Sequence, residues 1–514
     1  MFENNIWKIF LIFFFVSAFT SDIIMLWRTK GHINPDVSQG ICSAFFFLSN
    51  IKEDQTLKTN IRKTAGFVFV LASVLALGAC GENNDSNPVK DIIAQAEAMD
   101  EDALYAKAAE EINGKKFVVV ANSSRMKDAF PAWVKYVAEK EYAPKDFSAS
   151  FETTQPKNNQ IFSQIKGDVT GASHNISMTL IQDGSQIASK MTKPGYLLNY
   201  IPKEWKGSKE NDGQPLALQS LSKVFCYNTL GADGTVDGNK DMVNNVFDFV
   251  LNDKGEKFST QFMAPTSEPV GQNMMYMLTR DDYAAVVKEA YNAATTEQKA
   301  AVDKVLEDGN AGIKQLMVDG GFNDDAKYSL AWTYLWMKSY TKVDDDGPIS
   351  VNLTKKTSGG TAGLLVYSKF RSIKDTADVS KKPIQVAAYK DGYVGFGGYM
   401  YKHYLQILKT SPFPWTSCAF IHFMTNHAEG FQPWGKDMGG YSANPEVQKN
   451  FDHSKDGYKE DDGTEKTEVV YPVKNDKGYD WWTANEAGKG RLVLEDGEYC
   501  SKVAAVMNDW IAYL

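Results

Sequence analysis

The chain has 514 residues, more than one hydrophobic core usually holds, which predicts two domains or two lobes. Its formal net charge of -9 argues against nucleic acid as a partner, because phosphate binding needs a basic face. Hydrophobic residues make up 43% of the chain, which is enough to build packed cores.

The amino-terminal region contains a predicted export signal. Basic residues between 58 and 63 precede an apolar run, 65–77, that is too short to span a bilayer comfortably, and Leu77-Gly78-Ala79-Cys80 follows. This order resembles the lipobox of bacterial lipoproteins, which implies cleavage before Cys80 and acylation of its sulfur. Residues 57–79 would be the signal peptide and 80–88 a polar tether. The alternative is a plain signal peptide, or a short membrane helix, that happens to end in cysteine.

Residues 1–56 form an extension that the export signal does not explain. An apolar, aromatic-rich stretch at 6–27 precedes a complete signal, and two such segments in tandem are hard to reconcile. One hypothesis is a gene-start error, with the biological start near Leu57. The other is a membrane segment that retains the protein.

From residue 89 onward, hydrophobic periodicity predicts helices alternating with strands. Val89 to Asn113 indicates an amphipathic helix, and Phe117 to Ala121 a strand buried on both faces of a parallel sheet. Asn122-Ser123-Ser124 is predicted to cap the next helix, with Pro131 in its first turn. This succession is typical of a βαβ unit.

The later elements predict that the chain leaves this first α/β lobe and returns to it near the C-terminus. Further strands are expected at Asn175 to Ile181, Lys223 to Tyr227 and Ile384 to Tyr389. Further helices are expected after Thr279 and Thr295 as N-caps, around Trp332 to Trp336, and around Phe420 to Met424. The fold class indicated is therefore α/β.

Several segments resemble type II periplasmic binding proteins, in the branch grouped with ferric-iron-binding proteins. They are Ala106-Lys107-Ala108-Ala109-Glu110-Glu111, Asn122-Ser123-Ser124-Arg125, Gln182-Asp183-Gly184-Ser185-Gln186, Gly195-Tyr196-Leu197, Tyr200-Ile201-Pro202, Pro412-Phe413-Pro414-Trp415 and Ala419-Phe420-Ile421. The resemblance covers most of residues 106–445. It implies an extracytoplasmic solute-binding protein that delivers its solute to an ABC importer, and no enzyme activity.

The same resemblance implies a two-lobe fold with hinge strands between the lobes. Lobe 1 would begin with residues 89–228, lobe 2 would comprise 229–383, and 384–514 would hold the hinge return and the rest of lobe 1. The crossings would lie near 224–228 and 384–392. The resemblance also implies that closure of the hinge around a solute would be the signal to the membrane permease.

Polar side chains that follow predicted strands are the candidate ligand-binding residues. In open α/β sheets ligands bind at the carboxyl ends of strands, and a helix N-terminus there offers free N–H groups. The candidates are Ser123, Ser124, Arg125, Gln182, Asp183, Ser185, Tyr227, Asn228, Trp332 and Tyr334. Helix caps and Asx turns are the competing interpretation for the first six, and core packing for Trp332 and Tyr334.

The iron-type resemblance makes tyrosine, histidine and carboxylate side chains candidate metal ligands. Ferric-binding relatives use neighbouring tyrosines, and this chain has no adjacent Tyr-Tyr pair. His422 and His427 are five residues apart and do not share a helix face. Two stretches, 233–238 and 452–457, resemble the start of a calcium loop but lack the acidic twelfth residue. We therefore predict no metal site and no cofactor, and leave the solute open among iron, organic ions and sugars.

The five cysteines show no CxxC pair, so neither a zinc knuckle nor a thioredoxin-like motif is present. A disulfide among Cys226, Cys418 and Cys500 is compatible with export, and buried free thiols are favoured over it. The competing functions are a secreted, lipid-anchored hydrolase and a sensor that presents solute to a membrane receptor. No P-loop, HExxH or Gly-x-Ser-x-Gly motif supports the hydrolase. We expect a monomer anchored to the membrane by its lipid.

Overall fold

The computed structural model describes residues 87–156, 159–231, 235, 238–265, 269–355, 360–369, 384–386, 392–434, 440–450 and 479–514. The predicted signal peptide, Cys80, most of the first calcium-like stretch and all of the second lie outside these ranges. Among the described residues, no helix combines the length and apolar character needed to cross a membrane.

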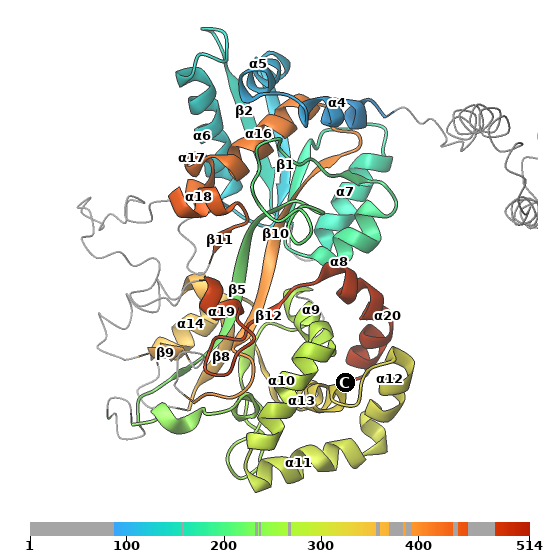
Figure 1. Cartoon of the computed structure of the whole chain (residues 1–514), viewed down its shortest axis with the longest axis vertical. Coiled ribbons are helices and arrows are strands. Elements are labelled where there is room, and N and C mark those ends of the chain that lie inside the picture. Colours follow the sequence, from blue (N-terminus) through green and yellow to red (C-terminus); the bar gives the residue numbers. More distant parts are fainter. Residues whose placement is uncertain are drawn as a thin grey trace, which may run out of the picture. The chain divides into compact units, whose positions relative to one another are not determined.

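The first lobe is a three-layer α/β structure (Figure 1). Its parallel strands are β1 (Lys115–Ala121), β2 (Ala149–Thr154) and β3 (Met178–Ile181), with β1 in the middle. One face carries α4 (Pro88–Ala96), α5 (Glu101–Ile112), α6 (Met126–Glu139), α16 (Pro414–Asn426) and α17 (Ala428–Phe431). The other face carries α7 (Gln160–Thr170). Alternate residues of β1 enter the two cores because side chains of a strand alternate between its faces.

The second lobe is mainly helical and has its own core. Its helices are α9 (Pro269–Met277), α10 (Asp281–Ala293), α11 (Thr296–Glu307), α12 (Ile313–Gly320), α13 (Ala326–Ser339) and α14 (Asp346–Lys355). Its strands are β6 (Gln261–Phe262), β7 (Thr341–Lys342) and β8 (Ala362–Val366). The stacked rings of Phe225 and Phe249 and the indole of Trp332 lie in this core.

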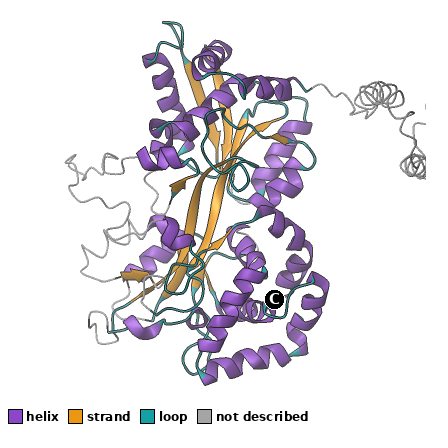
Figure 2. Cartoon of the chain, viewed as in Figure 1, coloured by secondary structure: helices purple, strands orange, loops and turns teal. Residues whose placement is uncertain are grey.

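Two long antiparallel strands connect the lobes. β5 (Ala217–Asn228) runs from the first lobe into the second, and β10 (Gly398–Leu408) returns beside it. At 12 residues, β5 spans about 40 Å, enough to belong to both lobes. The sheet order is β2-β1-β3-β10-β5-β8-β6-β7, so a single sheet runs through both lobes (Figure 2). The predicted two-lobe α/β fold with hinge strands is confirmed.

The position of the return crossing differs from the sequence prediction. β9 (Ile384–Val386) pairs with the second-lobe end of β5, and the return strand is β10, beyond the glycine-rich stretch. Gly398 begins β10 with a φ of 150°, and a Cβ atom there would lie 2.0 Å from the carbonyl oxygen of Lys223. The two crossing strands therefore approach each other at a point that only glycine allows.

The C-terminal segment also differs from the predicted boundaries, which assigned 384–514 to the hinge return and lobe 1. The last helix, α20 (Gly497–Tyr513), contacts α9 and α12 of the second lobe and also the first-lobe segment 184–192. Its buried side chains Cys500, Val503 and Met507 belong to the core of the second lobe. The predicted boundary follows the family resemblance, whereas the apolar face of α20 finds its partners in lobe 2.

The short elements complete the described chain. They are α8 (Gly184–Gln186), α18 (Pro445–Asn450), α19 (Tyr479–Thr483), the π-helical turn Ile187–Thr192, and the strands β4 (Leu197–Leu198), β11 (Tyr441–Ser442) and β12 (Val493–Leu494). Five 3-10 turns are Lys240–Met242, Val246–Phe249, Gly309–Ala311, Tyr367–Lys369 and Gln432–Trp434.

Several local predictions can be compared with the structure. Thr295 caps α11 in a reciprocal capping box with Gln298, as predicted. Thr279 is not an N-cap, because α10 begins two residues later and the Thr279 hydroxyl donates to the carbonyl of Tyr276. The predicted helix 89–113 is two helices, α4 and α5, separated by residues 97–100. Pro131 lies inside α6, beyond its first turn.

The three described cysteines are buried free thiols. Cys226, Cys418 and Cys500 belong to three different hydrophobic clusters, which keeps them apart. Burial raises the pKa of each thiol well above its ordinary value, so the thiols are neutral and behave as small apolar side chains.

Candidate ligand-binding cavity

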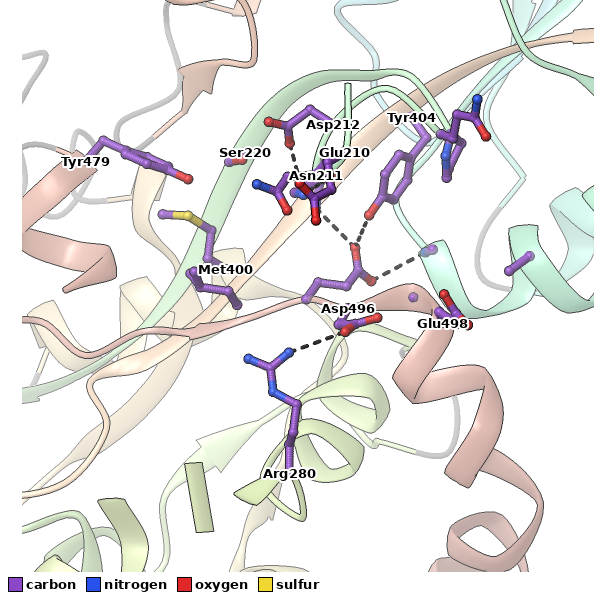
Figure 3. A pocket seen from close by; sticks show the side chains of 18 residues that line it. Glu210, Asn211, Asp212, Ser220, Arg280, Met400, Tyr404, Tyr479, Asp496 and Glu498 are labelled. Atoms are coloured by element: carbon purple, nitrogen blue, oxygen red, sulfur yellow. Dashed lines mark hydrogen bonds and ion pairs between the residues drawn. The ribbon is translucent and has the colours of Figure 1, made fainter. Parts of the chain in front are cut away.

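A cavity of about 780 Å³ opens where the crossing strands meet both lobes (Figure 3). The first lobe contributes Gly184 and Ala188, and the second lobe contributes Arg280 at the start of α10. The other lining residues are Glu210, Asn211, Asp212, Gln214, Pro215, Ser220, Met400, Lys402, Tyr404, Tyr479, Leu494, Glu495, Asp496, Gly497 and Glu498. Its volume suits a small molecule.

Glu495 is a buried carboxyl group in the wall of the cavity. The hydroxyl of Tyr404 donates to its Oε2 over 2.9 Å, and the backbone N–H of Gly184 donates to its Oε1 over 3.3 Å. The backbone N–H of Lys402 also donates to Oε2, over 3.4 Å. Burial, together with the charge of Asp183, raises the pKa of Glu495 to about 7. The side chain is therefore held in place and titrates close to neutral pH.

Asn273 joins Glu495 to Asp183 and so connects the two lobes. Its Nδ2 lies 3.2 Å from Asp183 Oδ1 and 3.1 Å from Glu495 Oε1. Asp183 follows β3 in the first lobe and caps α8 through the N–H of Gln186, whereas Asn273 lies on α9 of the second lobe. Burial raises the pKa of Asp183. These three residues therefore form a buried polar link between the two lobes.

Both cations of the cavity are paired. Arg280 lies 3.3 Å from Asp496 and 2.8 Å from Asp282, and Figure 3 shows Arg280 and Asp496 facing each other. Lys402 Nζ lies 2.9 Å from Asp212. Because Arg280 and Lys402 already pair with carboxylates, they leave little positive charge for an anionic ligand.

Carboxyl groups dominate the remaining charge. The lining holds five acidic residues, Glu210, Asp212, Glu495, Asp496 and Glu498, and two basic ones, so acidic side chains outnumber basic ones. Within the described residues, Glu210 and Glu498 are exposed and take part in no ion pair. Tyr404 and Tyr479 lie on opposite sides of the cavity in Figure 3 and add aromatic surface. This combination favours a cation.

The predicted residues from the first lobe gather at the carboxyl ends of β1 and β3. Asn122 accepts a hydrogen bond from the N–H of Gln182 over 3.2 Å, so the two strand-end loops touch. Gln182 Oε1 lies 3.4 Å from His403 Nε2. Burial and the nearby charge of Arg125 lower the pKa of His403 to about 3, so its ring is neutral.

Within that group the side chains differ in exposure and contacts. Ser124 is exposed, and Ser123 accepts the N–H of Arg125 over 3.4 Å, while α6 begins at Met126 without a side-chain cap. Ser185 is buried in α8. None of this predicted set lines the cavity, but Asp183 is linked to its wall through Asn273 and Glu495.

The predicted residues beyond β3 lie in the second lobe. Tyr227 donates to the carbonyl of Lys240 over 2.6 Å, and the side-chain amide of Asn228 donates to the carbonyl of Leu353 over 2.8 Å. The indole N–H of Trp332 donates to the carbonyl of Val246, and Tyr334 packs at the edge of the same core. These positions do not line the cavity.

The sequence reasoning missed the residues that form the cavity wall. Glu495, Asp496 and Glu498 come from the acidic Glu495-Asp496-Gly497-Glu498 segment, in which Asp496 caps α20 by accepting the N–H of Tyr499. An Asp before a long helical pattern was a detectable capping signal. The contacts of this segment with Tyr404 and Arg280 are tertiary contacts, so the sequence pattern could not indicate them.

The comparisons with known proteins give structural neighbours only. No protein-family model matches the chain, and no curated protein is similar in sequence. Iron-bound HitA from Pseudomonas aeruginosa matches with 12% identity over 76% of this chain and 99% of HitA, with a TM-score of 0.45. IdiA (FutA) of Trichodesmium, in complex with iron and citrate, matches with 10% identity over 78% of this chain and 100% of its own, with a TM-score of 0.43.

An ABC transporter substrate-binding protein from Bradyrhizobium japonicum is a third neighbour. It matches with 11% identity over 78% of this chain and 99% of its own, with a TM-score of 0.42. The first two of these neighbours hold iron in their structures, and the third is a substrate-binding protein of an ABC transporter.

Proposed function

We propose that this chain is an extracytoplasmic solute-binding protein that holds a small solute in the cavity between its lobes. The observation that carries the proposal is a cavity of about 780 Å³ lined by both lobes and by the two strands that connect them. Movement of the lobes about β5 and β10 would open and close this cavity. In this proposal the protein is a monomer, is anchored through acylated Cys80 and delivers its solute to an ABC permease.

The lining favours a cationic organic solute such as a polyamine or another amine. Arg280 and Lys402 are paired with carboxylates, while Glu210 and Glu498 face the cavity as exposed carboxylates. Tyr404 and Tyr479 are aromatic residues of the lining, and aromatic rings attract ammonium groups. An anion would meet the excess negative charge and lose affinity.

Thermal unfolding in the presence of a solute panel tests this function. The chain beginning at Gly81 would be screened with polyamines, amino acids, ferric citrate, sugars and sulfate. A ligand that binds only the folded state, at about 100 times its Kd, stabilises by about 2.7 kcal/mol. We expect the cationic compounds to raise the melting temperature most.

Charge-neutralising variants locate the binding. Replacing Glu210 and Glu498 together by Gln should weaken binding of the best cation by at least about tenfold, because both carboxylates face the solute. Glu307→Gln, at the exposed end of α11, is the matched control and should bind like the wild type. Preference for anions, or equal binding by both variants, would contradict the proposed solute class.

The competing function is a hydrolase, and Glu495 is the observation that favours it. A buried carboxyl group with a pKa of about 7 resembles a general acid. Three donors and the Asn273 amide already hold both of its oxygens, which suits a structural role better. Turnover of a compound that binds in the thermal screen would favour the enzyme, and its release unchanged would favour capture.

A further inference from the structure

A second cluster of chemically active side chains lies in the first lobe, apart from the cavity. Glu101 is the first residue of α5, His422 lies on α16, and His427 stands at the junction between α16 and α17. Each offers one ligand atom, and the three atoms lie within 4.8 Å of one another. These helices cover the sheet face opposite α7, and none of the three residues lines the cavity.

The spacing of His422 and His427 in the sequence did not indicate this cluster. His422 and His427 do not share a helix face, as the sequence indicated, but α16 ends at Asn426 and the chain turns there. An extended backbone at His427, with φ of −116° and ψ of 138°, brings its ring back toward His422, and the ring centroids are 5.6 Å apart.

Both imidazoles present Nε2 to a carboxylate. His427 Nε2 lies 3.0 Å from Glu101 Oε2, and His422 Nε2 lies 3.6 Å from Glu204 Oε2. In a tetrahedral site with bonds of about 2.1 Å, neighbouring ligand atoms are about 3.4 Å apart. The His427–Glu101 and His422–Glu204 separations lie on either side of that spacing. The ligand atoms of Glu101, His422 and His427 lie within 4.8 Å of one another, so metal binding requires the partly exposed side chains of Glu101 and His427 to move inward.

Tyrosine hydroxyls hold the opposite side of each ring. Tyr105 OH lies 2.9 Å from His422 Nδ1, and Tyr136 OH lies 3.5 Å from His427 Nδ1. A ring that carries its proton on Nδ1 donates it to the tyrosine oxygen and leaves the Nε2 lone pair for a metal, the usual outer-shell arrangement of a metal-binding histidine. Tyr136 also donates to Glu101 Oε1 over 3.1 Å, which orients the carboxylate.

We propose that Glu101, His422 and His427 bind a divalent transition-metal ion of the zinc type, with Glu204 or water as the fourth ligand. Two imidazole nitrogens and a carboxylate are ligands that Zn²⁺ prefers over Mg²⁺ and Ca²⁺, which take oxygen ligands. An ordinary ion pair explains His427 with Glu101. His422 adds a buried ring that directs Nε2 at a second carboxylate, that of Glu204. The bound ion would clamp the start of α5 to the α16–α17 turn.

Zinc binding to the chain beginning at Gly81, after chelator treatment, tests the proposal. Titration calorimetry should give one strong site for ZnCl₂, and thermal unfolding should shift upward with Zn²⁺ but not with MgCl₂ or CaCl₂. Co²⁺ should give the visible absorption of a tetrahedral nitrogen and oxygen site. Absence of a strong zinc site in the wild-type chain would overturn the proposal.

Variants of the two partly exposed ligands locate the ion without disturbing the core. His427→Gln and Glu101→Gln should each weaken zinc binding at least tenfold, while their melting temperatures without metal report whether they fold. Glu110→Gln, exposed on the same helix α5, is the matched control and should bind zinc like the wild type. Equal zinc affinity in all three variants would place the ion elsewhere in the chain and overturn the assignment.

Discussion

Glu495 shows how a single buried carboxyl group can link the cavity to pH. Its position is determined by donors from three different parts of the chain, at Gly184, Asn273 and Tyr404. Burial raises its pKa to about 7, well above that of a glutamate in the unfolded chain. The folded state therefore keeps a proton that the unfolded state has already lost.

This difference predicts a loss of stability as the pH rises from about 4.5 to about 7. In that window the native state binds one more proton than the unfolded state, so the free energy of unfolding falls, by on the order of 3 kcal/mol for Glu495. Urea unfolding at pH 5 and pH 8 measures it. Glu495→Gln cannot titrate and should show a smaller fall than the wild type.

Glu498→Gln provides the control for that measurement, because Glu498 is exposed in the same segment. It should retain the wild-type dependence on pH. If Glu495→Gln loses as much stability between pH 5 and pH 8 as the wild type does, Glu495 is not the group that titrates.

At the scale of elements, the close contact between β5 and β10 is the feature on which both lobes depend. The strands pair from Gly398 with Val224 to Tyr404 with Ala217, and every residue of β5 is buried. Lys223 of β5 and Asp346 of α14 form a buried ion pair, with nitrogen and oxygen 3.3 Å apart. A change in strand separation would thus disturb both lobes at once.

Gly398→Ala should destabilise the protein by about 2 kcal/mol or more, because the new methyl group would overlap the carbonyl of Lys223. Chemical denaturation measures the loss. Gly309→Ala is the control, since a Cβ there meets nothing within 4 Å, and it should change stability by less than about 1 kcal/mol. Equal stability of the two variants would show that β5 and β10 separate without cost.

At the scale of the whole molecule, the proposed function requires the chain to be held outside the membrane. The predicted acylation site, Cys80, lies seven residues before the first described residue, Asn87. In the proposed arrangement, residues 80–88 are the polar tether between the lipid and the first lobe.

Cys80→Ala should release the protein from the membrane fraction, because the acyl chain is the proposed anchor. Fractionation of cells, with labelling by a radioactive fatty acid, measures it: the wild type should carry label and the variant should not. Cys226→Ala, which removes a buried thiol, should keep both label and membrane association. A Cys80→Ala protein that stays with the membrane would indicate that another segment anchors the chain.

The sequence by itself determined the α/β class, the two-lobe organisation and several local elements. Hydrophobic periodicity and capping residues act over a few neighbouring positions, so the strand at Phe117 to Ala121 and the cap at Thr295 were readable without tertiary contacts. The tertiary structure alone decided the cavity and the histidine cluster. Glu495 meets Tyr404 across 91 positions and Asp183 meets Asn273 across 90, while His427 meets Glu101 across 326. Such pairs leave no periodic trace in the sequence, because chain folding, not local spacing, brings them together.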